Sequence, residues 1–304
     1  MQITTILQAY LNTQEIRPST KGVYQNFISK HIVPYFGAAE CSELSTEKIE
    51  GFASFLAVSG LTPAKIRAIV SFMKKGLKGQ YKRDIFSLDL KTGRAKGITV
   101  LSLHDQKRLE SQARLSDSAN KVGVFLCLYT GIRIGELCGL MWQDICFKTK
   151  LINVNRNVQR IKNEENDSFP KTKVVLMDLT GKSKRSIPIA DFLVDMLYEH
   201  KNTFYGKYVI SHNAHPVEPR IMQYRLKNLL QEAGLDSLNS VNFSTLRHTF
   251  ATRALENDFG INALSEILGH ASPVITCSRY VKGSGKMDLK RFYMVKFAQS
   301  VAGA

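Results

Sequence analysis

The sequence predicts a mainly α-helical protein with a small antiparallel β-sheet, divided into two domains. Helical periodicity fills the first ninety residues, a polar glycine-bearing stretch follows at residues 91–102, and the second half combines short strand-like segments with long helical ones. A chain of 304 residues is long enough for two domains that each bury an apolar core. We therefore expect a helical domain at residues 1–97 and a larger domain at residues 98–304.

The first domain is predicted to hold a bundle of four helices, because apolar residues recur at helical spacing in four segments. The start and stop signals are Ser19 and Thr20 as N-caps of the second helix, Pro34 with Gly37 at its end, Ser45 before the third helix, and Thr62-Pro63 before the fourth.

The second domain is predicted to open with helices and to place a sheet of three short strands beside them. The expected helices are 103–114 and 119–129, and the expected strands are 151–161, 171–179 and 184–190. The turn between the last two strands, TGKS, contains a glycine suited to a tight reversal. From Asp191 onward the pattern is almost wholly helical.

The charge balance points to a polyanionic partner. The chain has 42 Lys and Arg against 26 Asp and Glu, a net charge of +16. Such a charge attracts phosphate and displaces its counterions, so nucleic acid is the first candidate. A basic protein without such a partner, or one that binds anionic membranes, is the alternative that charge alone leaves open.

The composition also argues against several other classes. The longest apolar stretch, residues 122–129, is far shorter than the roughly 20 residues needed to cross a bilayer, and it predicts a buried helix. No secretory signal is visible at the N-terminus, so we expect a cytoplasmic protein without a membrane partner. The scattered, odd-numbered cysteines contain no CxxC pair, which disfavours a disulfide framework and a zinc site. These cysteines are Cys41, Cys127, Cys138, Cys146 and Cys277.

Three segments carry candidate catalytic residues, and each is ambiguous alone. In TGIRIGEL, Arg133 and Glu136 share a helix face, where a surface ion pair is an equally good explanation. In LRHTFAT, Arg247 lies near a helix N-terminus, where a cation does not help folding, so a role outside the helix is favoured. In LGHASPVITCSRYV, His270 precedes Tyr280 by ten residues, and either can be an ordinary structural residue.

Together these segments resemble a known family. TGxRxGEL, then LRHTFAT, then LGHxS followed by a tyrosine in RYV, closely resembles the tyrosine recombinases, also called the phage integrase family. The resemblance covers the second domain as the catalytic domain, and the first domain looks like the helical, SAM-like core-binding module that accompanies it. Through LSEILGH and the DLKR segment after RYV, the chain is most similar to integrases of conjugative transposons and phages of Gram-positive bacteria.

The resemblance implies a role for each candidate. Arg133 and Arg247 correspond to the two catalytic arginines, Tyr280 to the nucleophile, His270 to the late histidine, and Glu136 to the acidic residue beside the first arginine. Two planar guanidinium groups suit phosphodiester chemistry, because each gives two aligned donors to phosphate and keeps its charge. The phenol of a tyrosine becomes a nucleophile when positive charge and a proton acceptor are close.

Two further positions follow from the resemblance. A catalytic lysine is expected in the turn joining the second and third strands, which favours Lys182, with Lys184 and Lys173 as alternatives. The family usually has a histidine three residues before the second arginine, whereas this chain has Ser244. Serine forms hydrogen bonds but does not carry a proton at neutral pH as imidazole does, so the enzyme either tolerates the loss or is weakened.

The implied activity is site-specific recombination of DNA through a 3′-phosphotyrosyl link, with no cofactor, ATP or metal. The implied partners are a double-stranded DNA recombination site and a homo-tetramer on two DNA duplexes, in the cytoplasm of a bacterium and at its nucleoid. Residues 287–301 carry an apolar stripe at helical spacing, which either packs on its own domain or, as the resemblance implies, docks on a neighbouring protomer. Two alternatives stay open. The first is a DNA-binding relative with weakened catalysis, which Ser244 favours. The second is a type IB topoisomerase, which TGIRIGEL and the core-binding module disfavour.

Overall fold

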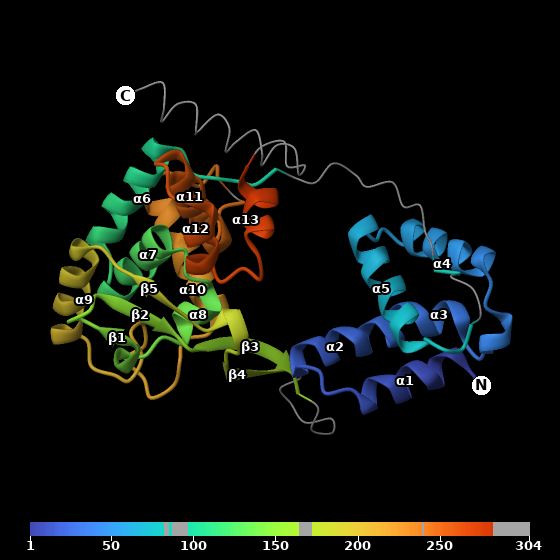
Figure 1. Ribbon diagram of the computed structural model, residues 1–304. Helices are drawn as coiled ribbons and strands as arrows, with labels where there is room; N and C mark the ends of the chain where they lie inside the picture. Colours follow the sequence, from blue (N-terminus) through green and yellow to red (C-terminus); the bar gives the residue numbers. More distant parts are fainter. Residues whose placement is uncertain (82–84, 87–96, 164–171, 239, 282–304) are drawn as a thin grey trace. The chain divides into compact units, whose positions relative to one another are not determined.

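The computed structural model describes residues 1–81, 85–86, 97–163, 172–238 and 240–281. It divides into two compact units, Met1–Lys96 with Arg160–Lys173, and Gly97–Gln159 with Val174–Ala304. The mainly helical fold with small sheets confirms the predicted fold class (Figure 1). Within the described residues, no helix combines the length and the apolar character needed to span a membrane.

The first unit is a helical bundle around an aromatic core. Its helices are α1 (Ile3–Thr13), α2 (Pro18–Phe27), α3 (Val33–Phe36), α4 (Thr46–Val58) and α5 (Pro63–Gly76). Phe52 and Phe72 are fully buried, and Tyr24 stacks on Phe72 at 4.4 Å between ring centroids. The side chains of Ser45 and Thr62 accept hydrogen bonds from the first turns of α4 and α5, as predicted.

The prediction for the start of the second helix of this unit was wrong, and the end predicted at Pro34 with Gly37 was met only at Gly37. The helix begins at Pro18 with Arg17 as the N-cap, so Ser19 and Thr20 lie inside its first turn. It also does not stop before Pro34, because a π-helical turn at Ile28–Ile32 leads directly into α3. Proline is tolerated there, since it occupies the first turn of α3. The helical run ends at Gly37, whose φ of +50° favours glycine.

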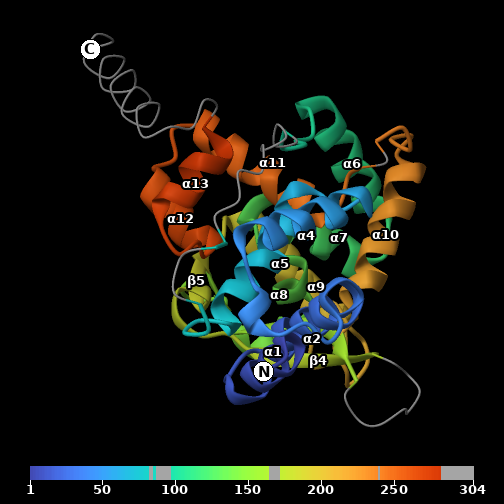
Figure 2. The same ribbon diagram turned by 90° about the vertical axis from the view of Figure 1, so that its right-hand side faces the viewer.

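The core of the second unit is built around α7 (Ser118–Thr130). Nine of the thirteen residues of α7 are buried, which confirms the predicted buried helix. It packs against α6 (Leu103–Leu115), α9 (Asp191–Thr203), α10 (Pro219–Glu232) and α11 (Phe243–Glu256), as Figure 1 shows. The remaining helices are α8 (Ile134–Cys138), α12 (Ile261–Leu268) and α13 (Pro273–Tyr280), and α12 and α13 lie side by side (Figure 2).

The strands form two sheets where the sequence predicted one. The predicted strand 151–161 is interrupted at Asn155 into β2 (Leu151–Val154) and β3 (Arg156–Lys162). An antiparallel sheet has the order β1-β2-β5, with β1 at Ile145–Cys146 and β5 at Arg185–Pro188, while β3 pairs with β4 (Thr172–Asp178). The third predicted strand therefore pairs with the start of the first one, and Val154 lies opposite Arg185.

Candidate active site

The site begins where α7 ends. Gly131 has a φ of +63°, and a Cβ there would meet side-chain atoms of Phe250 and Leu268 at 2.6 and 2.8 Å. A glycine thus allows α7 to approach α11 and α12 closely. Arg133 follows as the N-cap of α8, and Glu136 accepts hydrogen bonds from its backbone nitrogen at 3.0 Å and from its Nη1 at 2.8 Å.

Arg247 is held by the ends of two helices. Its guanidinium is buried, and it donates to the carbonyl of Gly131 at the end of α7 and to that of Leu268 at the end of α12. Helix C-termini leave carbonyls unpaired and carry partial negative charge, so they offset the burial of this cation. Burial and the charge of Arg133 lower the pKa of Arg247 to about 10, and it remains protonated at neutral pH.

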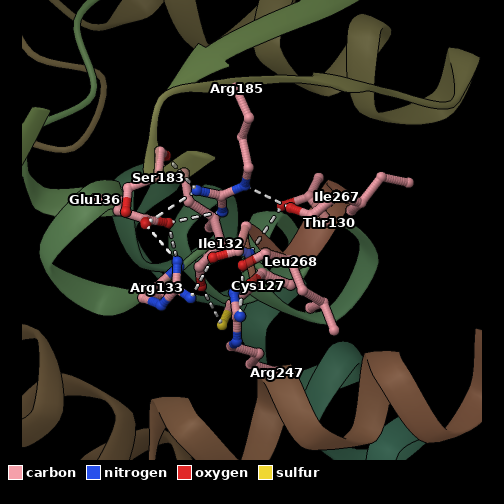
Figure 3. A network of polar contacts seen from close by, with 12 residues as sticks. Cys127, Thr130, Ile132, Arg133, Glu136, Ser183, Arg185, Arg247, Ile267 and Leu268 are labelled. Carbon is pink, nitrogen blue, oxygen red and sulfur yellow. Dashed lines mark hydrogen bonds and ion pairs between the residues drawn. The ribbon is translucent and has the colours of Figure 1, made fainter. Parts of the chain in front are cut away.

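The end of α12 is shared by three arginines (Figure 3). The consecutive carbonyls of residues 267–269 accept hydrogen bonds from Arg185, Arg247 and Arg133, respectively. The last carbonyls of a helix have no partner within the helix, so each of these bonds satisfies an acceptor that would otherwise need water. One backbone segment therefore fixes the positions of three guanidinium groups relative to one another.

Arg185 is a residue that the sequence reasoning missed. Its Nη1 and Nη2 lie 3.0 and 2.8 Å from the carboxylate oxygens of Glu136, and both side chains are buried. Burial raises the pKa of Glu136, but Arg185 and then Arg133 outweigh it and bring the pKa below its usual value. Strand alternation was the available signal, because it places Arg185 on the same face as the buried Ile187.

The structure leaves the choice of lysine open. The backbone of Lys182 lies in a 3-10 turn at Gly181–Ser183, where the Ser183 carbonyl accepts from Nη1 of Arg185 at 3.1 Å. The side chain of Lys182 lies outside what the structure describes. Lys184 lines an open pocket of about 440 Å³ that His270 also lines. Lys173 is exposed on β4, in the other sheet.

His270 connects the second arginine to α13. Its Nε2 lies 3.2 Å from Nη2 of Arg247, and its Nδ1 lies 2.8 Å from the Thr276 hydroxyl. A guanidinium only donates, so Nε2 is the acceptor and Nδ1 carries the hydrogen. Burial and the charges of Arg247 and Arg133 lower the pKa of His270 to about 4, which keeps the ring neutral. A hydrogen bond donated from Nε2 of His270 to an anion therefore requires that Nε2 first take up a proton.

Tyr280, the last residue of α13, lies between two histidines. Its hydroxyl is 2.9 Å from Nδ1 of His248, and its ring stacks on His270 with an interplanar angle of 12°. Burial raises the pKa of Tyr280, and the charges of Arg247 and Arg279 oppose this effect without cancelling it. The phenol is therefore protonated in the resting enzyme.

His248 was also not predicted as a site residue. Ser244 is exposed in the first turn of α11 and precedes His248 by four residues, so the two share a helix face. The four-residue spacing between Ser244 and His248 was therefore the sequence feature that could have identified His248 as a site residue. The structure thus brings Arg133, Arg247 and Tyr280 into one site with His270 and Glu136. Two cationic guanidinium groups beside a phenol can hold an anion that the phenol attacks.

Comparison with known proteins gives a consistent family assignment. Residues 99–286 match the Phage integrase family, and residues 3–57 match the family described as phage integrase, N-terminal SAM-like domain. A protein of Caldanaerobacter subterraneus named tyrosine recombinase XerC-like is 24% identical over 287 residues, which cover 86% of this chain and 72% of that protein.

Solved structures share the fold. The Tn1549 transposon integrase in complex with transposon right end DNA has a TM-score of 0.81 at 18% identity, covering 98% of this chain and 100% of that one. The lambda integrase tetramer bound to a Holliday junction has a TM-score of 0.62 at 16% identity, covering 96% of this chain and 77% of that one.

Proposed function

Because the chain belongs to the phage integrase family, we propose that it is a site-specific DNA recombinase that cuts and rejoins DNA through a covalent link to Tyr280. The observation that carries this proposal is the position of the Tyr280 phenol. Its hydroxyl is hydrogen-bonded to His248, and its ring stacks on His270, which contacts Arg247. A nucleophile, a charge clamp and a possible proton acceptor therefore meet at one point.

Each group has a task in the transfer of a phosphoryl group. Arg133 and Arg247 stabilise the negative charge that builds on the nonbridging oxygens, because both are charged and fixed before the reaction starts. Glu136 holds Arg133 in place from within the protein. His270 adds a hydrogen bond to the phosphate once the incoming negative charge raises its pKa and Nε2 is protonated.

The departing 5′ oxygen needs a proton, and we assign its supply to a lysine of the turn between β4 and β5. Lys182 is the first candidate from the sequence and Lys184 the second, with Lys173 less favoured because it lies on β4 in the other sheet. A lysine ammonium carries protons that it can donate to a leaving oxygen. The phosphotyrosyl link conserves the energy of the broken bond, so a second strand can attack it and restore the phosphodiester.

The partner in this proposal is double-stranded DNA. The net charge of +16 supports it, and so do the solved integrases of the same fold, which are bound to DNA. We further propose a homo-tetramer on two duplexes that acts at the bacterial nucleoid, in line with the lambda integrase tetramer on a Holliday junction. Residues 287–301, expected to mediate this assembly, lie outside the described residues.

The test is a suicide substrate built from DNA that flanks the gene of this protein. Wild type should form covalent protein–DNA adducts and recombinant junctions, and Tyr280→Phe should bind the same DNA without adducts, because only one hydroxyl is lost. Covalent adducts that persist in Tyr280→Phe would contradict the assignment of Tyr280 as the nucleophile. If the protein relaxes a supercoiled plasmid but forms no recombinant junctions, it is a topoisomerase. If it binds DNA and forms no covalent adducts, it is a DNA-binding relative.

A further inference from the structure

His248 occupies a position beside the reacting oxygen that the roles above leave unused. Its Nδ1 lies 2.9 Å from the hydroxyl of Tyr280, across the interface between α11 and α13. The ring is half-buried, and the centroids of the two rings are 5.6 Å apart. The ring of Tyr280 also lies nearly parallel to that of His270, with 6.5 Å between the ring centroids. This geometry fixes where the phenol proton can go.

The charges around His248 favour an imidazole that accepts a hydrogen bond. Burial lowers the pKa of His248, and the cations Arg279 on α13 and Arg247 on its own helix lower it further, so the ring is neutral at neutral pH. A neutral imidazole has one nitrogen with a lone pair. Because the protonated phenol of Tyr280 has a hydrogen to donate, an unprotonated Nδ1 satisfies both groups.

The other groups around Tyr280 are poorer acceptors. The guanidinium of Arg247 only donates hydrogen bonds. Nε2 of His270 already accepts from Arg247, and its Nδ1 faces Thr276. Ser244, one helical turn before His248, does not take up a proton at neutral pH as an imidazole does. Among the described side chains around the phenol, His248 is the one with a lone pair aimed at the reacting oxygen.

Resting on the function proposed above, we propose that His248 is a catalytic residue that takes the proton of Tyr280 during DNA cleavage and returns it during religation. In cleavage, a bond forms between Oη of Tyr280 and phosphorus, and the bond between phosphorus and the 5′ oxygen breaks. The phenol proton moves to Nδ1 of His248, and the 5′ oxygen takes a proton from the turn lysine. Religation reverses each transfer, so no proton is gained or lost over a full cycle.

The first test separates proton transfer from positioning. In His248→Asn, the amide oxygen stands close to the place of Nδ1 and still accepts a hydrogen bond, but it does not take a proton. Single-turnover cleavage of the suicide substrate should fall by about 10²- to 10⁴-fold in His248→Asn and in His248→Ala, with DNA affinity and Tm close to wild type for His248→Asn. His104→Asn, at an exposed histidine of α6, is the matched control and should cleave normally.

The second test changes the acidity of the nucleophile. Incorporation of a fluorotyrosine at position 280 lowers the phenol pKa, so the attack depends less on a base. The loss caused by His248→Asn should then shrink by at least about tenfold relative to the loss measured with tyrosine. A role limited to positioning predicts the same loss with either phenol.

The outcomes distinguish this inference from the function on which it rests. If wild type forms no adduct, the proposed function fails. If wild type forms adducts and His248→Asn cleaves equally fast, or fluorination leaves the loss unchanged, His248 is not the proton acceptor and the recombinase proposal stands. Should His248→Ala fail to fold, His248→Asn and the fluorotyrosine series still decide the question.

Discussion

The carboxylate of Glu136 is held between two guanidinium groups, with Oε1 2.8 Å from Nη1 of Arg133 and Oε2 2.8 Å from Nη2 of Arg185. Through this one acid, Arg133 is tied to Arg185, the first residue of β5. Arg185 in turn binds the carbonyls of Ser183 and Ile267. The turn that bears Lys182 and Lys184 is therefore connected through Arg185 to Glu136, which binds Arg133, and to the end of α12, which binds Arg247.

Arg185→Ala should destabilise the protein strongly, because it leaves Glu136 buried with one cation in place of two. Removing one partner of a buried ion pair costs about 3 to 5 kcal/mol. Urea denaturation measures the change in unfolding free energy. Lys150→Gln removes an exposed ion pair with Asp191 and should cost less than about 1 kcal/mol. Equal effects of the two substitutions would contradict the assigned role of Arg185.

Arg247→Lys should reduce cleavage by at least about 10²-fold while the protein still binds DNA, since lysine keeps the charge but not the planar pair of donors. The measurement is single-turnover adduct formation. Arg253→Lys, on the same helix but paired with Glu256 near the surface, is the control and should stay within a few-fold of wild type. Normal cleavage by Arg247→Lys would show that cleavage does not need the planar pair of guanidinium donors.

Much of this fold was predictable because local patterns determine it. The nearly continuous apolar run of α7 and the caps Ser45 and Thr62 are properties of adjacent residues. The division of strand 151–161 was not predictable in this way. Period-two alternation is the same whether a segment pairs with one neighbour throughout or changes partner at Asn155. Only the distant pairing of β2 with β5 determines where the strand ends.

The site shows the same limit. The residues Arg133, Arg247, His270 and Tyr280 were named from their motifs, and the structure brings them together. What holds the arginines is the row of carbonyls at residues 267–269, and backbone carbonyls leave no mark on the sequence. The partner of Tyr280 depends on how α11 packs against α13, which helical spacing alone does not determine.

DNA binding should weaken steeply with salt, because a basic protein releases condensed counterions from the phosphates that it neutralises. The logarithm of the binding constant should fall by roughly 0.9 per neutralised phosphate for each decade of salt concentration. Fluorescence anisotropy of a labelled duplex between low and moderate salt gives the slope. A flat response would contradict the nucleic-acid partner that the charge of +16 suggests.

His270 should make stability depend on pH between its two protonation limits. Its pKa is about 4 in the folded protein and 6.5 ordinarily, so between these values the unfolded chain binds a proton that the folded chain does not. The stability linked to this group is complete above about pH 6.5 and is lost as the pH falls towards 4.

Denaturation of wild type and His270→Asn at several pH values isolates this effect. The difference in unfolding free energy between them should decrease by about 2 kcal/mol from pH 7.5 to 5, since one pKa unit corresponds to about 1.36 kcal/mol. His104→Asn controls for loss of an exposed histidine. A difference that stays constant with pH would show that His270 titrates normally in the folded protein.

The last prediction concerns Ser244, which stands where the family usually has histidine. A histidine there lies one helical turn before His248 on the same face of α11. It supplies an imidazole near the phosphate and a second proton acceptor near the phenol. Ser244→His should therefore raise single-turnover cleavage with little change in DNA affinity.

The effect of Ser244→His should be larger when it is combined with His248→Asn. If His248 takes the phenol proton, Ser244→His has most to add when His248 is gone, and it should recover at least about tenfold of the lost rate in the double variant. Ser244→Ala controls for removal of the serine itself. If Ser244→His is no faster in either background, the site has adapted to serine, and the proton transfers proceed through His248 and the turn lysine without help from this position.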